Sequence, residues 1–150
     1  MDESQRHLVK SEEEQGISRK LMAWINRYPN LPEDVYRVDF EQLPAAAEGM
    51  ALSVAQSTYI VKRYIAGGHL AEYQFSIVYR IKPGTSNDAR LKADEVLNAL
   101  GDWAVDNWPD LGENIKIKSF ETSTRAALQV PYDNGDEDHN ILMRFRYEVI

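Results

Sequence analysis

The sequence predicts an α+β domain: a mostly antiparallel sheet with two main helices packed on one face and a long protruding β-hairpin. Three observations predict it. Residues 71–81 alternate apolar and polar side chains with the period of a strand. Two segments, 17–28 and 91–108, repeat apolar residues at helical spacing. Short alternating segments follow the second helix and close the chain. We expect residues 1–150 to form one domain, a usual size for a single core.

The hairpin is the most informative feature. Gly67 and Gly68 supply the positive φ that a tight reversal requires. Eleven residues at about 3.4 Å each span roughly 37 Å, whereas a usual strand has about 5–6 residues. We therefore expect the ribbon to overhang its own domain. In residues 71–81 the apolar set is Ala71, Tyr73, Phe75, Ile77, Tyr79 and Ile81, and the alternating set is Glu72, Gln74, Ser76, Val78 and Arg80.

A protruding antiparallel ribbon favours assembly, because unpaired strand edges invite a neighbouring chain. Large amphipathic side chains on an overhang are suited to anchor such contacts. For Tyr64 and Tyr73, ordinary cross-strand packing is an equally open interpretation. The candidate oligomer interface consists of Tyr64, Gly67, Gly68, His69 and Tyr73.

The elements before the hairpin are a helix and weaker strands. Residues 1–14 are expected to form a frayed lead. From Ser11 the apolar pattern predicts a helix that Pro29 and Pro32 end. Alternation in residues 35–40, with Tyr36, Val38 and Phe40 on one face, predicts a short strand before a connection at 44–47. Residues 50–54 give a thin strand signal.

The elements after the hairpin are a long helix and three strands. Residues 83–88 form a turn that leads into a helix N-cap. The following helix is expected to lie across the sheet until Pro109 ends it. Its apolar stripe is Leu91, Val96, Leu97, Leu100, Trp103, Ala104 and Trp108. Strands are predicted at 115–120, 125–130 and 141–149.

Composition narrows the function classes. The absence of cysteine excludes disulfides, thiol catalysis and thiolate zinc sites. The net charge of −7 argues against binding nucleic acid, whose affinity depends on neutralised phosphates. No apolar run approaches the roughly 18 residues of a membrane span. The amino terminus lacks the pattern of a secretory signal, which predicts a cytoplasmic setting.

Catalytic motifs are absent from the sequence. The two glycines lack the spacing of a dinucleotide site or a P-loop, and no serine stands in a nucleophile elbow. One acidic segment, Asp133, Asp136, Glu137 and Asp138 beside His139, could hold a hard cation or act as acid and base. It lacks the alternation of an EF-hand loop, so a solvated loop joining Val130 to Ile141 is the favoured interpretation. We expect no enzyme activity, no cofactor and no metal.

Four segments carry a family resemblance: ISRKLMAWINRYPNLP, YIAGGHLAEYQFSIVYRI, DARLKADEVLNALGDWAV and YDNGDEDHNILMRFRYEV. Together they resemble the minor capsid or tail-completion proteins of long-tailed bacteriophages, across about residues 17–149. Proteins of this group are similar in size to tail terminators. The resemblance implies an α+β subunit that self-associates as a hexameric ring on the tail tube and docks to the head connector. It implies a virion component assembled in the host cytoplasm, with no catalytic residues.

Several alternatives remain open. Within the same joint the chain could be a head–tail stopper or another minor capsid component. From other classes, a regulatory module could bind a peptide at an exposed sheet edge, or a metal-dependent enzyme could use the acidic segment. For the ring, we hypothesise an acidic lumen through which DNA passes with little adhesion.

Overall fold

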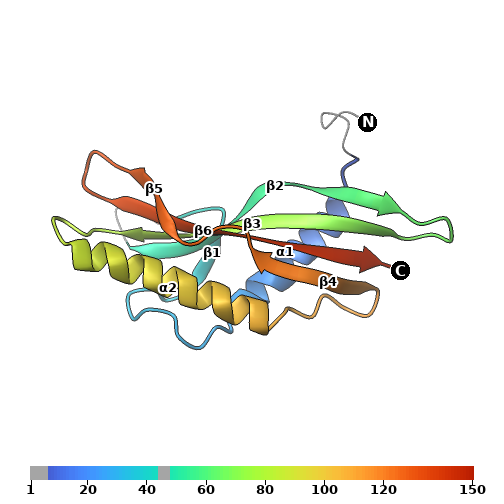
Figure 1. The fold of residues 1–150 in the computed structure, drawn as a ribbon, viewed down its shortest axis with the longest axis horizontal. Helices are drawn as coiled ribbons and strands as arrows, with labels where there is room; N and C mark the ends of the chain where they lie inside the picture. Colours follow the sequence, from blue (N-terminus) through green and yellow to red (C-terminus); the bar gives the residue numbers. More distant parts are fainter. Residues whose placement is uncertain (1–6, 44–47) are drawn as a thin grey trace.

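The computed structural model describes residues 7–43 and 48–150, which form one mixed sheet and two helices. Within these residues the sheet order is β1-β2-β3-β6-β4, and β5 pairs with the other half of β6. Among the strand pairings of the described residues, the β1–β2 pairing alone is parallel. The predicted α+β class with a mostly antiparallel sheet is confirmed (Figure 1). The elements are α1 (Ser11–Ile25), β1 (Val38–Phe40), β2 (Gly49–Arg63), β3 (His69–Ile81), α2 (Asn87–Asp106), β4 (Ile115–Thr122), β5 (Ala127–Pro131) and β6 (Glu137–Val149).

Strand β3 lies in the middle of the sheet, between β2 and β6. Its pairing with β6 runs from His69 opposite Val149 to Ile81 opposite Glu137 without a register shift. Its pairing with β2 contains three irregularities, between Val54 and Lys62. The predicted long hairpin is therefore present, but β6 holds its second strand along the full length. Only the turn at residues 64–68 extends past the last paired residue of β6.

The period-two pattern of β3 is confirmed by burial. All six residues of its predicted apolar set are buried. The other face of β3 is not simply solvated, however, because Glu72 and Ser76 are also buried, at 3% and 7% exposure. Glu72 lies opposite Tyr59 on β2 and Arg146 on β6, and both side chains reach its carboxylate. Long neighbouring side chains thus bury polar groups on the face without helices.

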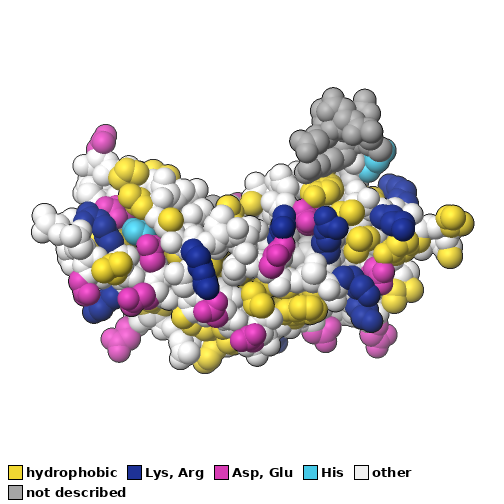
Figure 2. Space-filling model, in the orientation of Figure 1, with side chains coloured by type: hydrophobic (Ala, Val, Ile, Leu, Met, Phe, Trp, Pro, Cys, Tyr) yellow, Lys and Arg dark blue, Asp and Glu magenta, His cyan; other side chains and the backbone are white. Residues whose placement is uncertain are grey.

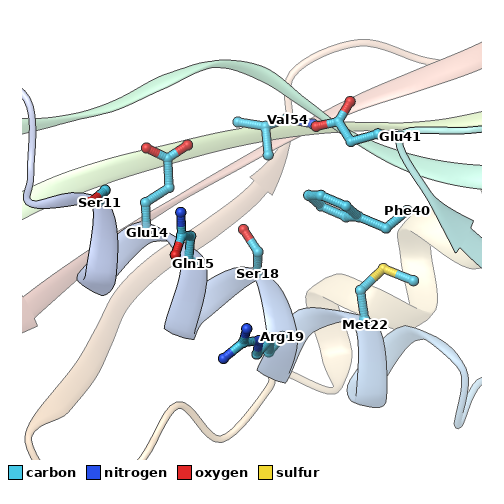
Figure 3. A pocket seen from close by; sticks show the side chains of 9 residues that line it. All are labelled: Ser11, Glu14, Gln15, Ser18, Arg19, Met22, Phe40, Glu41 and Val54. Carbon is cyan, nitrogen blue, oxygen red and sulfur yellow. The ribbon is translucent and has the colours of Figure 1, made fainter.

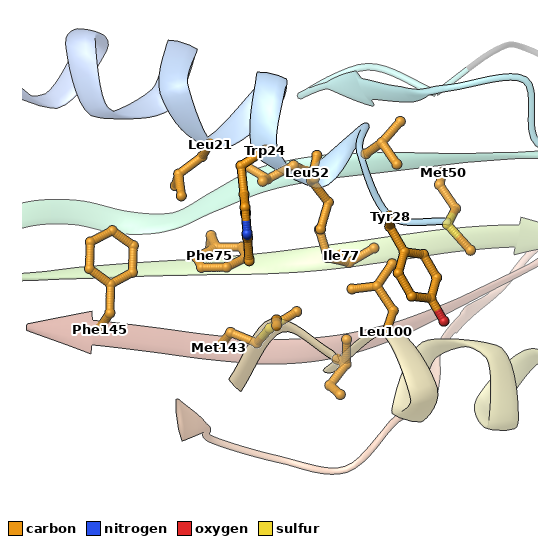
Figure 4. Packing of buried hydrophobic residues seen from close by; sticks show 14 of the residues in the cluster. Leu21, Trp24, Tyr28, Met50, Leu52, Phe75, Ile77, Leu100, Met143 and Phe145 are labelled. Atoms are coloured by element: carbon orange, nitrogen blue, oxygen red, sulfur yellow. The ribbon is translucent and has the colours of Figure 1, made fainter. Parts of the chain in front are cut away.

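Both helices cover the apolar face of the sheet. Trp24 of α1 stacks on Trp103 of α2, with ring centroids 5.2 Å apart, so the two helices share one core. At the centre, the ring of Phe145 stacks on Tyr73 at 5.2 Å and on Phe120 at 5.4 Å. Figure 4 shows part of this core, with Phe75, Met143 and Phe145 on the strands and Leu21 and Trp24 on α1. Offset aromatic stacks of this kind add stability beyond the buried area alone.

The approach of α2 to the sheet depends on a small residue. Gly101 lies on the buried face of α2, and a Cβ there would come within 2.7 Å of the Ile141 Cδ1 atom. The helix therefore packs closely over β6. Two residues of the predicted stripe, Leu91 and Trp108, are exposed at 61% and 46%. Leu91 lies near the start of the helix, and Trp108 lies beyond its end, where its half-exposed ring stacks on Phe120 of β4 with centroids 6.5 Å apart.

The prediction that residues 1–14 form a frayed lead is wrong for residues 7–14, which the structure describes. Leu8 forms a β-bridge with Tyr59, and the Val9 amide donates to the Thr58 carbonyl at 3.1 Å. Val9 is 6% exposed, and α1 begins at Ser11. Residues 1–6 lie outside the described residues. A single apolar pair was enough to attach this segment to the edge of β2.

Strand β1 is shorter than predicted. Of the three residues predicted to share one face, only Val38 is buried, whereas Tyr36 is 94% and Phe40 42% exposed. The Asn26 side chain after α1 accepts from the Val38 amide at 2.8 Å and donates to its carbonyl at 3.1 Å, which fixes the strand start. Residues 50–54, which show only a weak strand pattern in the sequence, are part of β2, which is one continuous strand. The predicted connection at 44–47 lies outside the described residues.

Among the described helices, none has the length and apolar character needed to cross a membrane.

We predict that Phe145→Ala lowers the free energy of unfolding by about 3–5 kcal/mol, because it empties the centre of the aromatic cluster. Leu91→Ala, on the exposed side of α2, is the matched control and changes it by less than about 0.5 kcal/mol. Urea denaturation followed by tryptophan fluorescence measures both. Equal losses in the two variants would contradict the assignment of the core.

Candidate assembly surface

The hairpin tip, defined here as residues 61–68, is largely exposed. Ile65 has 109% relative exposure and Val61 37%. Gly67 and Gly68 have φ values of +100° and +83°, which confirms the predicted reversal. The Tyr64 amide donates to the Gly68 carbonyl at 3.1 Å, and the Gly67 amide donates to the Tyr64 carbonyl at 3.2 Å. The tip is therefore a closed turn that presents an apolar side chain.

The base of the hairpin tip is fixed to the end of β6. The Tyr64 hydroxyl donates to Glu148 at 2.6 Å, and this hydrogen bond raises the pKa of Tyr64. Gly68 lies against the Val149 carbonyl so closely that no side chain fits between them. These contacts hold the turn in one orientation, which lowers the entropy cost of binding a partner.

His69 lies beside α1. Its Nε2 atom is 3.0 Å from the Glu13 carboxylate, which also accepts from the Tyr147 hydroxyl at 2.6 Å. Burial raises the pKa of Tyr147, and the Glu13 contact raises it further. One carboxylate thus links the start of α1 to β3 and β6. His69 belongs to the base of the hairpin rather than to its projecting turn.

Tyr73 lies in the core. Its side chain is fully buried under α1, and its hydroxyl is 2.7 Å from the Ser18 hydroxyl oxygen. Burial raises the pKa of Tyr73 to about 12. Of the two interpretations left open for Tyr73, the structure favours packing inside the domain, because the helices cover the apolar face of β3. Of the predicted interface residues, Tyr64, Gly67 and Gly68 lie at the tip.

The acidic segment is not a solvated loop. Strand β6 begins at Glu137, four residues before the predicted start, and pairs with both β3 and β5. Asp133 is exposed, as expected. In contrast, Asp136, Glu137, Asp138 and His139 are all at most 8% exposed. The favoured interpretation of the sequence is wrong here, and burial of these acids requires partners.

Those partners come from distant parts of the chain. Arg80 of β3 donates to both oxygens of Asp138, at 2.8 Å and 3.0 Å. Arg90 of α2 donates to Glu137 at 2.9 Å. Burial alone would raise the pKa of Glu137, but hydrogen bonds from His139 and Arg90 outweigh burial and lower it. These bidentate pairs join β3, β6 and α2.

His139 completes this network. Its Nδ1 atom is 2.7 Å from Asp94 and its Nε2 atom is 3.1 Å from Glu137. In the part of the chain that the structure describes, no three His, Asp or Glu side chains are grouped as a metal site. The buried acids act as ion-pair and hydrogen-bond partners that fix the beginning of β6.

The face without helices also carries the buried carboxylate of Glu72. It accepts hydrogen bonds from Tyr59 at 2.6 Å, Gln74 at 2.8 Å and Arg146 at 3.1 Å. Burial would raise the pKa of Glu72, but these three donors together lower it. The network joins β2, β3 and β6 across the sheet. It stiffens the half of the sheet that leads to the hairpin tip.

A pocket of about 610 Å³ lies between α1 and the edge formed by β1 and β2. We call it the α1 pocket. Figure 3 shows the Phe40 ring pointing into this space above Met22, with Glu14 and Glu41 at its upper rim. Glu41 has a φ of +63°, and its carboxylate accepts from the Ser53 hydroxyl and the Val54 amide. Its described lining is Ser11, Glu14, Gln15, Ser18, Arg19, Met22, Phe40, Glu41 and Val54.

The surface around these sites carries both charge signs. Figure 2 shows Lys and Arg side chains interspersed with Asp and Glu over one face of the molecule.

Sequence reasoning did not find the α1 pocket. Phe40 was the one available signal, and it was interpreted as one of the apolar residues on a face of a short strand.

The fold has a counterpart among solved structures. A chain described as "Virion of native gene transfer agent (GTA) particle" matches with a TM-score of 0.56. It is 15% identical, and the match covers 86% of this chain and 93% of that chain. At this identity the likeness shows a shared fold. A second solved chain, 19% identical over 95% and 96% of the two chains, has a TM-score of 0.47. No protein family profile and no curated protein sequence match the chain.

We predict that Gly67→Ala and Gly68→Ala separate backbone strain from contact at the tip. Gly67→Ala places alanine at positive φ in open space and costs about 1–2 kcal/mol. Gly68→Ala has the same strain and also collides with the Val149 backbone, so its loss of unfolding free energy is larger. Chemical denaturation measures the free energy of unfolding of both variants and of the unmodified chain. Equal losses would show that the tip does not pack on the end of β6.

We predict that Glu72→Gln lowers stability by about 1–3 kcal/mol at pH 7. Because the folded pKa of Glu72 is lowered, its contribution is present above its usual value of 4.5 and is lost as pH falls through the folded value. The difference between the variant and the unmodified chain should therefore shrink below about pH 4. Glu113→Gln, at an exposed position, is the control. A difference in unfolding free energy that does not change with pH would contradict the stabilising role of the ionised Glu72 carboxylate in this network.

Proposed function

We propose that this chain is a structural virion protein without enzymatic activity: a tail terminator that closes the end of a tail tube as a ring and joins it to the head. The fold shared with a chain of a gene transfer agent virion supports the coarser part of this proposal. The resemblance to tail-completion proteins and the edges of the sheet support the terminator role.

The two edges of the sheet are the observation that carries the proposal. One edge is formed by β1 and by β2, which Leu8 already pairs at Tyr59, and the other edge is formed by β4 and β5. In the described residues, β1 pairs only with β2, and β4 and β5 pair only with β6. Unpaired strand edges are suited to contact another chain. Because the two edges differ, one edge of a copy would contact the other edge of the next copy in a head-to-tail arrangement. Repeating this contact generates a ring when the rotation between successive copies closes on itself.

A ring of this kind offers surfaces to different partners. One rim meets the tail tube protein and the other meets the head connector proteins, while the hole passes DNA. Each copy has a net charge of −7, so a hexamer is strongly acidic and repels a polyanion. This supports a lumen that does not bind DNA sequence-specifically. Assembly occurs in the host cytoplasm, and the product resides in the virion.

Electron microscopy of particles produced without this chain tests the role. We predict finished capsids beside overlong, unattached tails, because nothing ends tube polymerisation. Restoring the chain from a plasmid should recover normal tails, and an empty plasmid is the control. Normal tails attached to heads that leak DNA would contradict termination and indicate a stopper.

A further inference from the structure

We propose that the hairpin tip of one copy binds in the α1 pocket of the next copy. This inference rests on the proposed function, because it names the contact through which the ring closes. Each copy then offers one tip and one pocket, so every copy in a closed ring has both occupied.

The tip is apolar and basic. Ile65 is fully exposed, and burying such a side chain contributes about 1.5–3 kcal/mol. Lys62 and Arg63 precede it and are exposed, and neither forms a salt bridge within the described residues. No acidic residue occurs between Tyr59 and Leu70. The tip therefore presents one large aliphatic side chain beside two positive charges for which the described residues supply no salt-bridge partner.

The α1 pocket has the complementary chemistry. Met22, Phe40 and Val54 supply apolar lining, and Phe40 is 42% exposed in the single chain. Glu14 and Glu41 stand at the rim. Neither carboxylate has a salt-bridge partner in residues 7–43 or 48–150, and Arg19 is the one cation in the described lining. A volume of about 610 Å³ falls within the roughly 300–1,000 Å³ range of pockets that enclose ligands.

Ile65 cannot reach the apolar end of the α1 pocket in its own chain, although the other end of the pocket, at Glu14, lies near the base of the hairpin, where Glu13 contacts His69. Val54 lines the pocket, and Ile65 follows eleven residues later on the same extended hairpin arm. At about 3.4 Å per residue, the two lie roughly 37 Å apart. The contacts of Tyr64 and Gly68 with the end of β6 hold the tip in its outward position. The occupant of the pocket is thus the tip of a second copy.

Cysteine cross-linking tests this contact directly, because the chain has no cysteine of its own. Full-length Ile65→Cys and Phe40→Cys proteins are mixed with purified tail tubes under mild oxidation. We expect a disulfide-linked heterodimer, with at least fivefold more product than Ile65→Cys gives with Tyr36→Cys. Tyr36 is the matched control because it is 94% exposed and lies outside the pocket lining. A single chain that carries both Ile65→Cys and Phe40→Cys should give a ladder of covalent oligomers.

Charge exchange checks the same contact without a cysteine in the pocket. We expect Lys62→Glu to lower the mass of the assembled species measured by light scattering, and Glu14→Lys in the same chain to restore it. Both side chains lie outside the core, so each variant should unfold at the denaturant concentration of the unmodified chain. Equal assembly of all three proteins would contradict the pairing of tip and pocket.

The outcomes separate this inference from the proposed function. Assembly on tail tubes without the cross-link between positions 65 and 40 overturns the tip contact and leaves the terminator role standing. Absence of both assembly and cross-link overturns both. Capture of the tail tube protein by Phe40→Cys, in place of a second copy, assigns the pocket to another partner and also overturns the inference.

Discussion

The uninterrupted pairing of β3 with β6 is the interaction on which the rest of the structure depends. Both strands have 13 residues and are paired from end to end. This register places Tyr73 opposite Phe145 and Phe75 opposite Met143, which builds the aromatic layer that α1 and α2 cover. The same register places Arg80 opposite Asp138 on the other face. A shift by one residue would exchange the two faces and leave buried charges unpaired.

The length of this pairing also accounts for the assembly surface. The sheet runs on toward the hairpin tip beyond α2, so its far half depends on α1 and on the polar network around Glu72 (Figure 1). The tip projects because β6 ends opposite His69, while Tyr64 and Gly68 bind the last residues of β6. One structural feature therefore stabilises the core and presents an ordered apolar turn to other molecules.

Local patterns predicted the parts of the fold that local physics determines. The alternation in β3, the glycine reversal and the two helices followed from periodicity and turn chemistry. The acidic segment was misinterpreted because its partners, Arg80 and Arg90, lie more than 40 residues earlier and come near only through the sheet. Alternation placed Tyr73 on the apolar face correctly, but the ribbon was expected to overhang the domain at this residue, whereas α1 covers it there. The α1 pocket was missed because it joins α1 to a turn after β1, and Phe40 alone carried its signal.

A cryo-electron microscopy map of the head–tail junction of the assembled particle tests the central claim most directly. Our account predicts a ring of copies of this chain at the end of the tail tube, in which density for Ile65 of each copy lies between Met22 and Phe40 of the neighbour. A junction without this chain, or a ring whose hairpin tips project into solvent beside empty pockets, would contradict it.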